Sequence, residues 1–276
     1  MKFRTEIGNI SRSFAISHND RIVLIGSCFA DNIGERLVSA GFNAVHNPMG
    51  PLFNPASIAG LVRRGQIPYS AADFITGPDG TLHCLDFANR YQDTDISQLA
   101  NMVNTDYASL SRAIAEADVL IITFGNDKIY EYNGEVAGNC HKLPASTFTS
   151  RYLDIDEICS LWHCAIPTGK RVIFTLSPVR YIGDGLAQSG LSKATLRVAI
   201  DKICRDGGYD YFPAYEIVND DLRDYRFYSA DLKHPSDVAV DYIYEKFAET
   251  YFTKETISRA EECRKATLHA AHRPLL

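Results

Sequence analysis

The sequence has no long uninterrupted apolar segment and no excess of basic residues. Its 276 residues include 28 Lys and Arg against 34 Asp and Glu, which gives a formal net charge of -6. No window approaches the roughly 20 apolar residues of a membrane-spanning helix, and residues 1–6 do not begin the apolar run of a signal peptide. The acidic balance argues against a broad nucleic-acid surface or a polybasic membrane patch. These absences predict a cytoplasmic protein with no membrane span and no nucleic-acid partner.

Paired cysteines and metal-binding patterns are also missing. The seven cysteines are scattered and form no C-x-x-C pair, which is typical of reduced thiols rather than of a disulfide framework or a zinc site. No two histidines stand four residues apart on one helix face. The segment Gly183-Asp184-Gly185 lacks the third glycine of a dinucleotide fingerprint. We therefore expect neither a metal nor a cofactor.

Short apolar runs alternate along the chain with helical patterns. Strands buried on both faces are predicted at 21–26, 119–123 and 171–176, with a shorter last strand at 209–212. Helices are predicted at about 29–40, 55–61, 96–117 and 156–165, and a further helix is predicted from a Ser192 cap to about residue 205. This alternation predicts an α/β protein with a central parallel sheet covered by helices on both faces.

The alternation is interrupted between about residues 66 and 92. There Pro78-Asp79-Gly80 predicts a hairpin or loop insertion, and farther along Asn133-Gly134 is a strong hairpin signal between two short strands. Residues from about 236 to 270 have the pattern of one or two amphipathic helices. We predict a single domain over residues 1–276, with an insertion at about 66–92 and C-terminal helices at about 236–270.

Reactive side chains follow the predicted strands, where parallel sheets bind ligands. Ser27 comes directly after the first strand, at a helix start whose free N–H groups can stabilise an oxyanion. In a late loop, His234 can act as a base that Asp231 orients, and Pro235 disfavours helical backbone at His234. A serine at a strand end can also be a helix cap only, and D-x-x-H arises often by chance. Spacing alone therefore leaves a catalytic triad open.

Several motifs together resemble the GSCFA-domain family of bacterial proteins. The segment Gly26-Ser27-Cys28-Phe29-Ala30 has the five residues that give this family its name, and the resemblance extends from Phe3 to about Phe247. Further matching segments are 53–57, 139–142, 176–180, 191–195, 212–216 and 224–236. The family is similar in turn to the SGNH hydrolases, whose fold is a flavodoxin-like three-layer α/β/α sandwich. The resemblance implies Ser27 as nucleophile, His234 as general base and Asp231 as its orienting carboxylate.

The same resemblance implies an oxyanion hole. Its expected donors are backbone N–H groups at Ser27 and at Gly50, the latter after a second strand, and one asparagine side chain. Asn126 and Asn139 compete for that last role. We favour Asn126, because its position at a strand end places it beside Ser27 without requiring a loop to fold back.

Other polar residues near these motifs have open roles. His141, with Lys142 beside it, could contact an anionic substrate group or merely stand at a hairpin end. Arg180 could bind a carboxylate or phosphate of the substrate, or pair with a nearby aspartate to order its loop. Cys28 adjoins Ser27 and could be a reactive thiolate, but a buried packing role is favoured for this position.

The sequence thus predicts a serine esterase that acts on acyl esters, acetyl esters above all, of a carbohydrate or a similar polar metabolite. Two alternatives use the same fold. An O-acyltransferase would pass the acyl group to a sugar hydroxyl instead of water, and a carbohydrate-binding or assembly protein would keep the fold without catalysis. No feature of the sequence indicates an oligomeric state.

Overall fold

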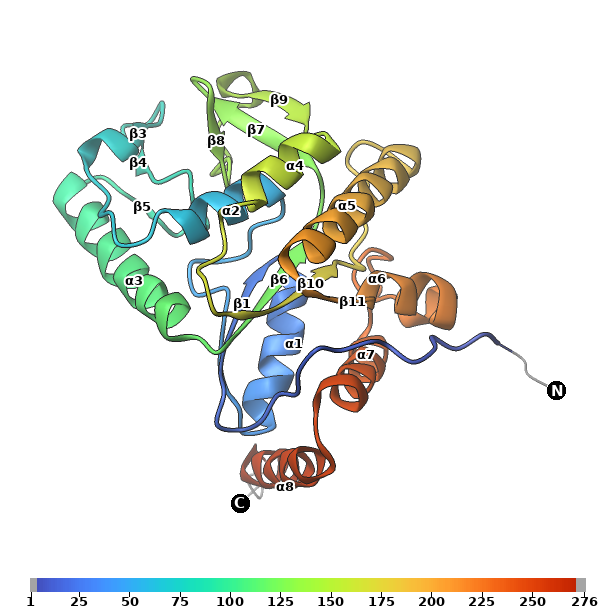
Figure 1. Ribbon diagram of the computed structural model, residues 1–276. Coiled ribbons are helices and arrows are strands. Elements are labelled where there is room, and N and C mark those ends of the chain that lie inside the picture. The colour runs from blue at the N-terminus through green and yellow to red at the C-terminus, as the bar shows by residue number, and fades with distance from the viewer. Residues whose placement is uncertain (1–3, 272–276) are drawn as a thin grey trace, which may run out of the picture.

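The centre of the computed structural model, which describes residues 4–271, is a five-stranded parallel sheet (Figure 1). Its strands are β1 (Arg21–Gly26), β2 (Asn43–His46), β6 (Val119–Phe124), β10 (Arg171–Leu176) and β11 (Asp210–Phe212). They lie in the order β11-β10-β6-β1-β2, and every pairing in the sheet is parallel. This is the flavodoxin-like strand order, in which the first strand lies between the second and the third.

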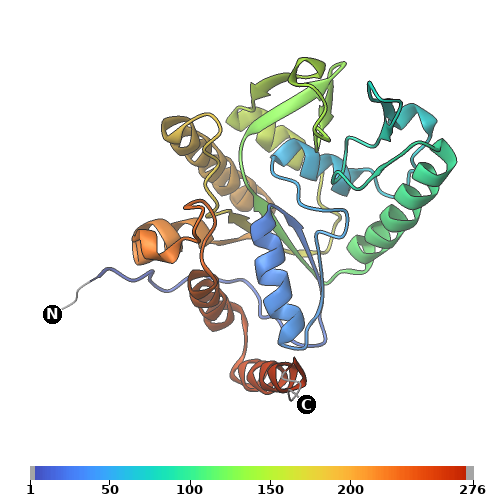
Figure 2. The same cartoon turned by 180° about the vertical axis from the view of Figure 1, so that it is seen from behind.

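Helices cover both faces of the sheet (Figures 1 and 2). One layer contains α2 (Pro55–Arg63), α3 (Ile96–Glu116), α4 (Ile155–Trp162) and α5 (Leu186–Gly207). The other contains α1 (Cys28–Ser39), α6 (Ala214–Glu216), α7 (Asp237–Tyr251) and α8 (Lys254–Ala271). Within β1, Val23 and Ile25 pack in the first core while Ile22 and Leu24 pack in the second. The predicted three-layer α/β/α fold is confirmed.

Local sequence signals explain where several helices begin. Asn54 caps α2, because its side-chain oxygen accepts the N–H of Ser57 at 2.8 Å, and Pro55 fits the first helical position. The predicted Ser192 cap is wrong, since α5 already begins at Leu186. Ser192 instead lies inside α5, where its hydroxyl accepts the N–H of Asp127 at 3.1 Å. The helical pattern of residues 186–191 is weakened by Gly190, which hid the true start of α5.

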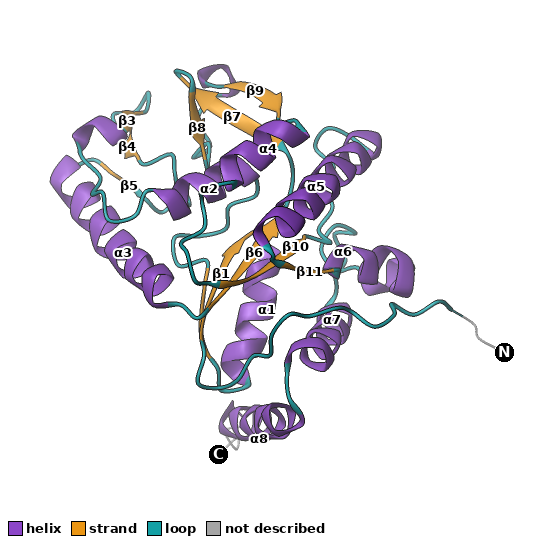
Figure 3. Ribbon diagram, in the orientation of Figure 1, coloured by secondary structure: helices purple, strands orange, loops and turns teal. Residues whose placement is uncertain are grey.

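Two small antiparallel sheets lie outside the central one (Figure 3). The first, within the predicted insertion and just after it, follows the short helix η1 (Ala71–Asp73) and pairs β3 (Ile75–Thr76), β4 (Leu82–His83) and β5 (Gln92–Asp93). The second pairs β7 (Lys128–Tyr132) with β8 (Glu135–Ala137) and β9 (Thr149–Tyr152), and η2 (Ala145–Thr147) precedes β9. The hairpin predicted at Asn133-Gly134 joins β7 to β8. That the chain is a single domain stays a prediction.

The C-terminal part of the chain packs on the α1 side of the sheet. It contains η3 (Ile217–Leu222), η4 (Tyr225–Phe227) and the two predicted terminal helices, α7 and α8. The N-terminal segment joins this layer, because the N–H of Ile16 donates to Tyr251 O at 2.8 Å. None of the described helices combines the length and apolar character that crossing a bilayer requires.

The end of β1 approaches β6 so closely that only glycine fits. Gly26 has a φ of 145°, a conformation that side chains rarely adopt, and an added Cβ would overlap the carbonyl oxygen of Thr123. The next N–H, that of Ser27, donates to this same oxygen at 3.1 Å. Gly26 therefore lets the chain leave β1 and enter α1 within one residue.

We expect Gly26→Ala to lower the free energy of unfolding by at least ~2 kcal/mol, because the new methyl group has no space and the backbone angle is strained. Urea unfolding followed by circular dichroism measures the change. Gly190→Ala is the matched control. Gly190 lies in α5 with open space around its Cα, so this change should stabilise the protein by ~0.5–1 kcal/mol. Equal stability of Gly26→Ala and the wild type would contradict the close approach.

Candidate active site

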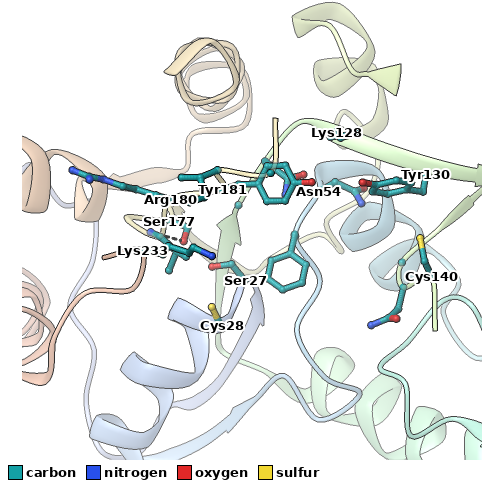
Figure 4. A pocket seen from close by; sticks show the side chains of 18 of the residues that line it. Ser27, Cys28, Asn54, Lys128, Tyr130, Cys140, Ser177, Arg180, Tyr181 and Lys233 are labelled. Carbon is teal, nitrogen blue, oxygen red and sulfur yellow. Dashed lines mark hydrogen bonds between the residues drawn. The ribbon is translucent and has the colours of Figure 1, made fainter. Parts of the chain in front are cut away.

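A cavity of about 640 Å³ opens where β1, β6 and β10 end. We call it the Ser27 cavity. Its walls come from the residues after these strands, the β7–β8 hairpin and the loop before α7. Figure 4 shows Ser27, Ser177 and Lys233 on one side of this cavity, with Tyr130 and Cys140 on the other. The structure thus joins segments from both ends of the chain at the carboxyl edge of the sheet, where ligands bind in this class of fold.

Ser27 is the N-cap residue of α1. Its backbone is extended, and its hydroxyl oxygen accepts the N–H of Phe29 at 3.3 Å, so the serine is also the helix cap. The residue is only 1% exposed, yet it lines the cavity. The cap interpretation and the nucleophile interpretation are therefore compatible, because a serine hydroxyl can accept one hydrogen bond and still donate its proton.

The turn that carries Ser27 is held by Asn47, a residue that sequence reasoning missed. The Asn47 side-chain oxygen accepts the N–H of Gly26 at 2.9 Å, and its amide nitrogen donates to Ser27 O at 3.2 Å and to Asp31 at 3.0 Å. Asp31 in turn binds His46 Nδ1 at 2.8 Å. Asn47 is buried and directly follows β2, and this strand-end position was the available signal.

His234 and Asp231 form a tight pair at the cavity edge. His234 Nδ1 lies 2.6 Å from Asp231 Oδ2, and since a carboxylate only accepts, the Nδ1–H donates and Nε2 is left as the acceptor. The other carboxylate oxygen accepts the backbone N–H groups of Lys233 and His234 at 2.9 and 3.0 Å. The bond from His234, with these two backbone donors, holds the pKa of Asp231 well below its usual range. Asp231 is therefore ionised at neutral pH, as an orienting carboxylate must be.

Ser27 and His234 line the same cavity, but in the described chain no hydrogen bond joins their side chains. His234 is about half exposed, and its Nε2 has no protein partner among the described residues. Catalytic contacts are often loose before substrate binds. The structure thus brings nucleophile and base to one cavity without completing the contact between them.

Two predicted oxyanion donors are already used elsewhere. The N–H of Ser27 donates to Thr123 O, as described above. The N–H of Gly50 donates to Asn47 O at 2.8 Å, and Gly50 does not line the cavity. These bonds, one at the strand end and one in a tight turn, occupy both N–H groups. Cys28 is the first residue of α1, and first-turn N–H groups have no partner within their helix, so its N–H is the available backbone donor.

Side-chain amides supply further donors. Asn126 and Asn139 both line the cavity. Asn139 Oδ1 accepts the N–H of His141 at 2.8 Å, which leaves its amide nitrogen free to donate, whereas the Asn126 side chain has no protein partner among the described residues. Asn54, predicted only as a helix cap, is a third lining amide (Figure 4). The choice between Asn126 and Asn139 stays open in the geometry.

Arg180 reaches the cavity wall but its guanidinium turns away from Ser27 (Figure 4). The guanidinium stacks on the rings of Tyr228 and Tyr225, 4.1 and 4.9 Å from their centroids. Its backbone N–H donates to Lys233 O at 3.1 Å. Arg180 therefore joins the loop after β10 to the loop that carries His234. The alternative role of pairing with Asp184 is not observed, since Asp184 binds Lys128 at 2.8 Å.

His141, for which the sequence left open a substrate contact or a place at a hairpin end, does not line the Ser27 cavity. Its Nε2 lies 3.0 Å from Phe87 O and its Nδ1 lies 3.3 Å from His83 Nδ1. The backbone of His141 and Lys142 is left-handed, and this turn directs the imidazole into the protein. Burial lowers the pKa of His141, which favours its neutral form.

Cys28 is the other candidate for a reactive group beside Ser27. Burial raises the pKa of the Cys28 thiol, so it is not an activated thiolate. Among the residues that the structure describes, no group of three or more His, Cys, Asp or Glu side chains could hold a metal ion.

Fold and site together define a class: parallel three-layer α/β proteins with a serine and an Asp–His pair at the carboxyl edge of the sheet. Within it, the chain belongs to the GSCFA family, whose sequence model matches residues 21–247. The match includes Ser27, Asp231 and His234. No curated protein matches the chain.

We expect Asn47→Ala to lower the free energy of unfolding by ~1–3 kcal/mol, because it leaves the buried Gly26 N–H unpaired, whereas Ser27 O keeps the N–H of Ala30. Urea unfolding provides the measurement. The control is Asn101→Ala, an exposed residue of α3, which should not destabilise the protein. If both variants unfold at the same urea concentration as the wild type, Asn47 does not hold the turn.

Proposed function

We propose that this protein is an ester hydrolase of the SGNH type, with Ser27 as nucleophile, His234 as general base and Asp231 as the carboxylate that orients it. The observation that carries the proposal is the shared cavity. It places a serine at a helix start near an imidazole whose Nδ1–H is held by an ionised carboxylate. When the neutral ring donates from Nδ1 to Asp231, Nε2 is the ring atom that can accept the serine proton.

The reaction has two halves. Ser27 Oγ attacks the ester carbonyl carbon while His234 Nε2 takes the hydroxyl proton, and the imidazolium then gives that proton to the departing alcohol. A water molecule, deprotonated by His234, attacks the resulting acyl-serine. The acid leaves, and the proton returns to Ser27 Oγ. Asp231 stabilises the imidazolium in both halves without taking its proton.

The oxyanion would be held by the N–H of Cys28 and by one asparagine side chain. Cys28 N–H lies next to the reacting hydroxyl and at the positive end of α1. Asn126 is favoured as the side-chain donor because it follows β6, the direct neighbour of β1. Asn139 is the alternative. Ser27 N–H and Gly50 N–H are not part of this oxyanion hole, since both already donate within the protein.

The proposed substrate is an acyl ester, an acetyl ester in the first place, of a carbohydrate or similar polar metabolite. The cavity can hold a compound of that size, and aromatic side chains of Phe53, Tyr130 and Tyr181 line it beside the asparagine amides. Aromatic faces with a few polar groups suit a ring that has both apolar and hydroxyl surfaces.

One observation favours a second candidate, a carbohydrate-binding protein without catalysis. Ser27 Oγ is buried and is not bonded to His234 in the described chain. Catalysis requires His234 to approach Ser27 when substrate binds, and the half-exposed side chain of His234 leaves room for that movement. An acyltransferase would need the same approach, so product analysis with added sugar acceptors separates it from a hydrolase.

A fluorophosphonate probe should label the wild type once, on Ser27, and block its esterase activity. The Ser27→Ala variant should take up no probe and lose at least ~10³-fold in kcat, because its nucleophile is gone. Intact-protein mass spectrometry and an acetyl-ester assay measure these outcomes. Unlabelled, inactive wild type would support the binding protein, and equal labelling of Ser27→Ala would rule out the serine mechanism.

Asp231→Asn should lower kcat by ~10³–10⁴-fold with little change in fold, because asparagine can stabilise the wrong imidazole tautomer. In the wild type, the depressed pKa of Asp231 keeps this carboxylate ionised as the pH falls toward its usual range, so its protonation does not limit activity there. The matched control is Asp237→Asn, whose side chain is almost fully exposed. Similar activity in both variants would argue against the orienting role.

A further inference from the structure

Lys193 of α5 is buried under the Ser27 cavity. Only 4% of this residue is exposed, although lysine is among the residue types that proteins bury least. Its ammonium nitrogen donates to Gly125 O at 2.6 Å and to Ser177 O at 2.7 Å. A buried ammonium is tolerated only when it is hydrogen-bonded, and these two bonds meet that need.

The two carbonyl groups belong to neighbouring strand ends. Gly125 follows β6 and Ser177 follows β10, and both residues line the cavity. Asn126, the favoured oxyanion donor, is the next residue after Gly125. One side chain therefore links the two loops that form the floor of the site.

The link extends to the catalytic base. Beyond Ser177, the N–H of Arg180 donates to Lys233 O, directly before His234 in the chain. A shift of the Ser177 loop would thus move the backbone beside His234. Lys193 is joined through hydrogen bonds and short chain segments both to the oxyanion donor and to the base.

The charge of Lys193 is not cancelled by a carboxylate in an ion pair among the described residues. The titratable groups that face it are Cys28 from α1, Asp127 after β6 and the Tyr215 ring, whose centroid lies 5.8 Å away. Burial raises the pKa values of Cys28, Asp127 and Tyr215. A positive charge in this setting favours negative charge developing nearby, as in an oxyanion.

We propose that Lys193 is a positioning residue for the esterase reaction: it fixes the Gly125–Asn126 and Ser177 loops, and its charge favours the oxyanion formed at Ser27. This assignment rests on the proposed function. It goes beyond the triad, because Lys193 touches no reacting atom and acts through the two loops that it holds and through the electrostatic effect of its charge.

The assignment predicts a distinct pH dependence. Burial lowers the pKa of Lys193 to about 7, so the ammonium form is present below that pH and is lost as the pH rises through it. If the charge assists the reaction, kcat of the wild type falls on the alkaline side. A purely structural lysine would give no such decline, because a neutral amine can still donate to both carbonyl groups.

The test compares Lys193→Met with Lys202→Met, a surface lysine of the same helix that pairs with Asp156. We expect Lys193→Met to lower kcat about 100-fold with KM little changed, to slow fluorophosphonate labelling of Ser27, and to lose the alkaline decline. Lys202→Met should match the wild type. If Lys193→Met does not fold, Lys193→Gln, whose amide can still donate to one carbonyl group, carries the same comparison.

The outcomes separate this assignment from the proposed function. If the wild type is active and a folded Lys193 variant has the same kcat and the same pH profile, the assignment of Lys193 is wrong and the proposed function is unaffected. A variant that loses stability but keeps kcat and the alkaline decline overturns it as well, because Lys193 is then only structural. Wild type that neither hydrolyses esters nor takes up the probe overturns the proposed function, and the assignment with it.

Discussion

The close contact between Gly26 and Thr123 determines much of the rest of the structure. It holds the end of β1 against β6, turns the chain into α1 within one residue, and commits the Ser27 N–H to the Thr123 carbonyl group. Ser27 is consequently fixed at the helix start with its hydroxyl at the cavity. Because of the same contact, the backbone donor of the proposed oxyanion hole is the N–H of Cys28, which lies beyond the last strand hydrogen bond.

The cavity is built from backbone carbonyl groups and amides as much as from Ser27, Asp231 and His234. Asn47 holds the turn at Gly26 and Ser27, and Lys193 holds the ends of β6 and β10. Asn47 and Lys193 each form hydrogen bonds with buried backbone groups at the ends of strands. Unpaired backbone groups in a protein interior lower its stability. Stability and positioning of the cavity thus depend on the same few polar side chains.

Local patterns in the sequence predicted the fold well, because buried strands and capped helices have short-range signals. The apolar run at 21–26 and the Asn54-Pro55 helix start are examples. The errors have both local and long-range causes. The Gly50 N–H is used by a turn, His141 is directed toward His83 by left-handed backbone, and Ser192 lies within a helix that starts earlier. Lys193 shares a helix face with the buried residues Leu196 and Ile200, a spacing that signals burial but not its carbonyl partners.

The central claim is that Ser27 carries the acyl group during turnover. The direct measurement is rapid acid quenching of the wild type during reaction with an activated acetyl ester, followed by peptide mapping and fragmentation. The account predicts one acetyl group on the peptide that contains Ser27 and Cys28, located on the serine oxygen and absent in His234→Gln. An acetyl group on Cys28 would contradict it. So would product formation without any adduct and without an initial burst, if the Ser27→Ala variant catalysed the same reaction.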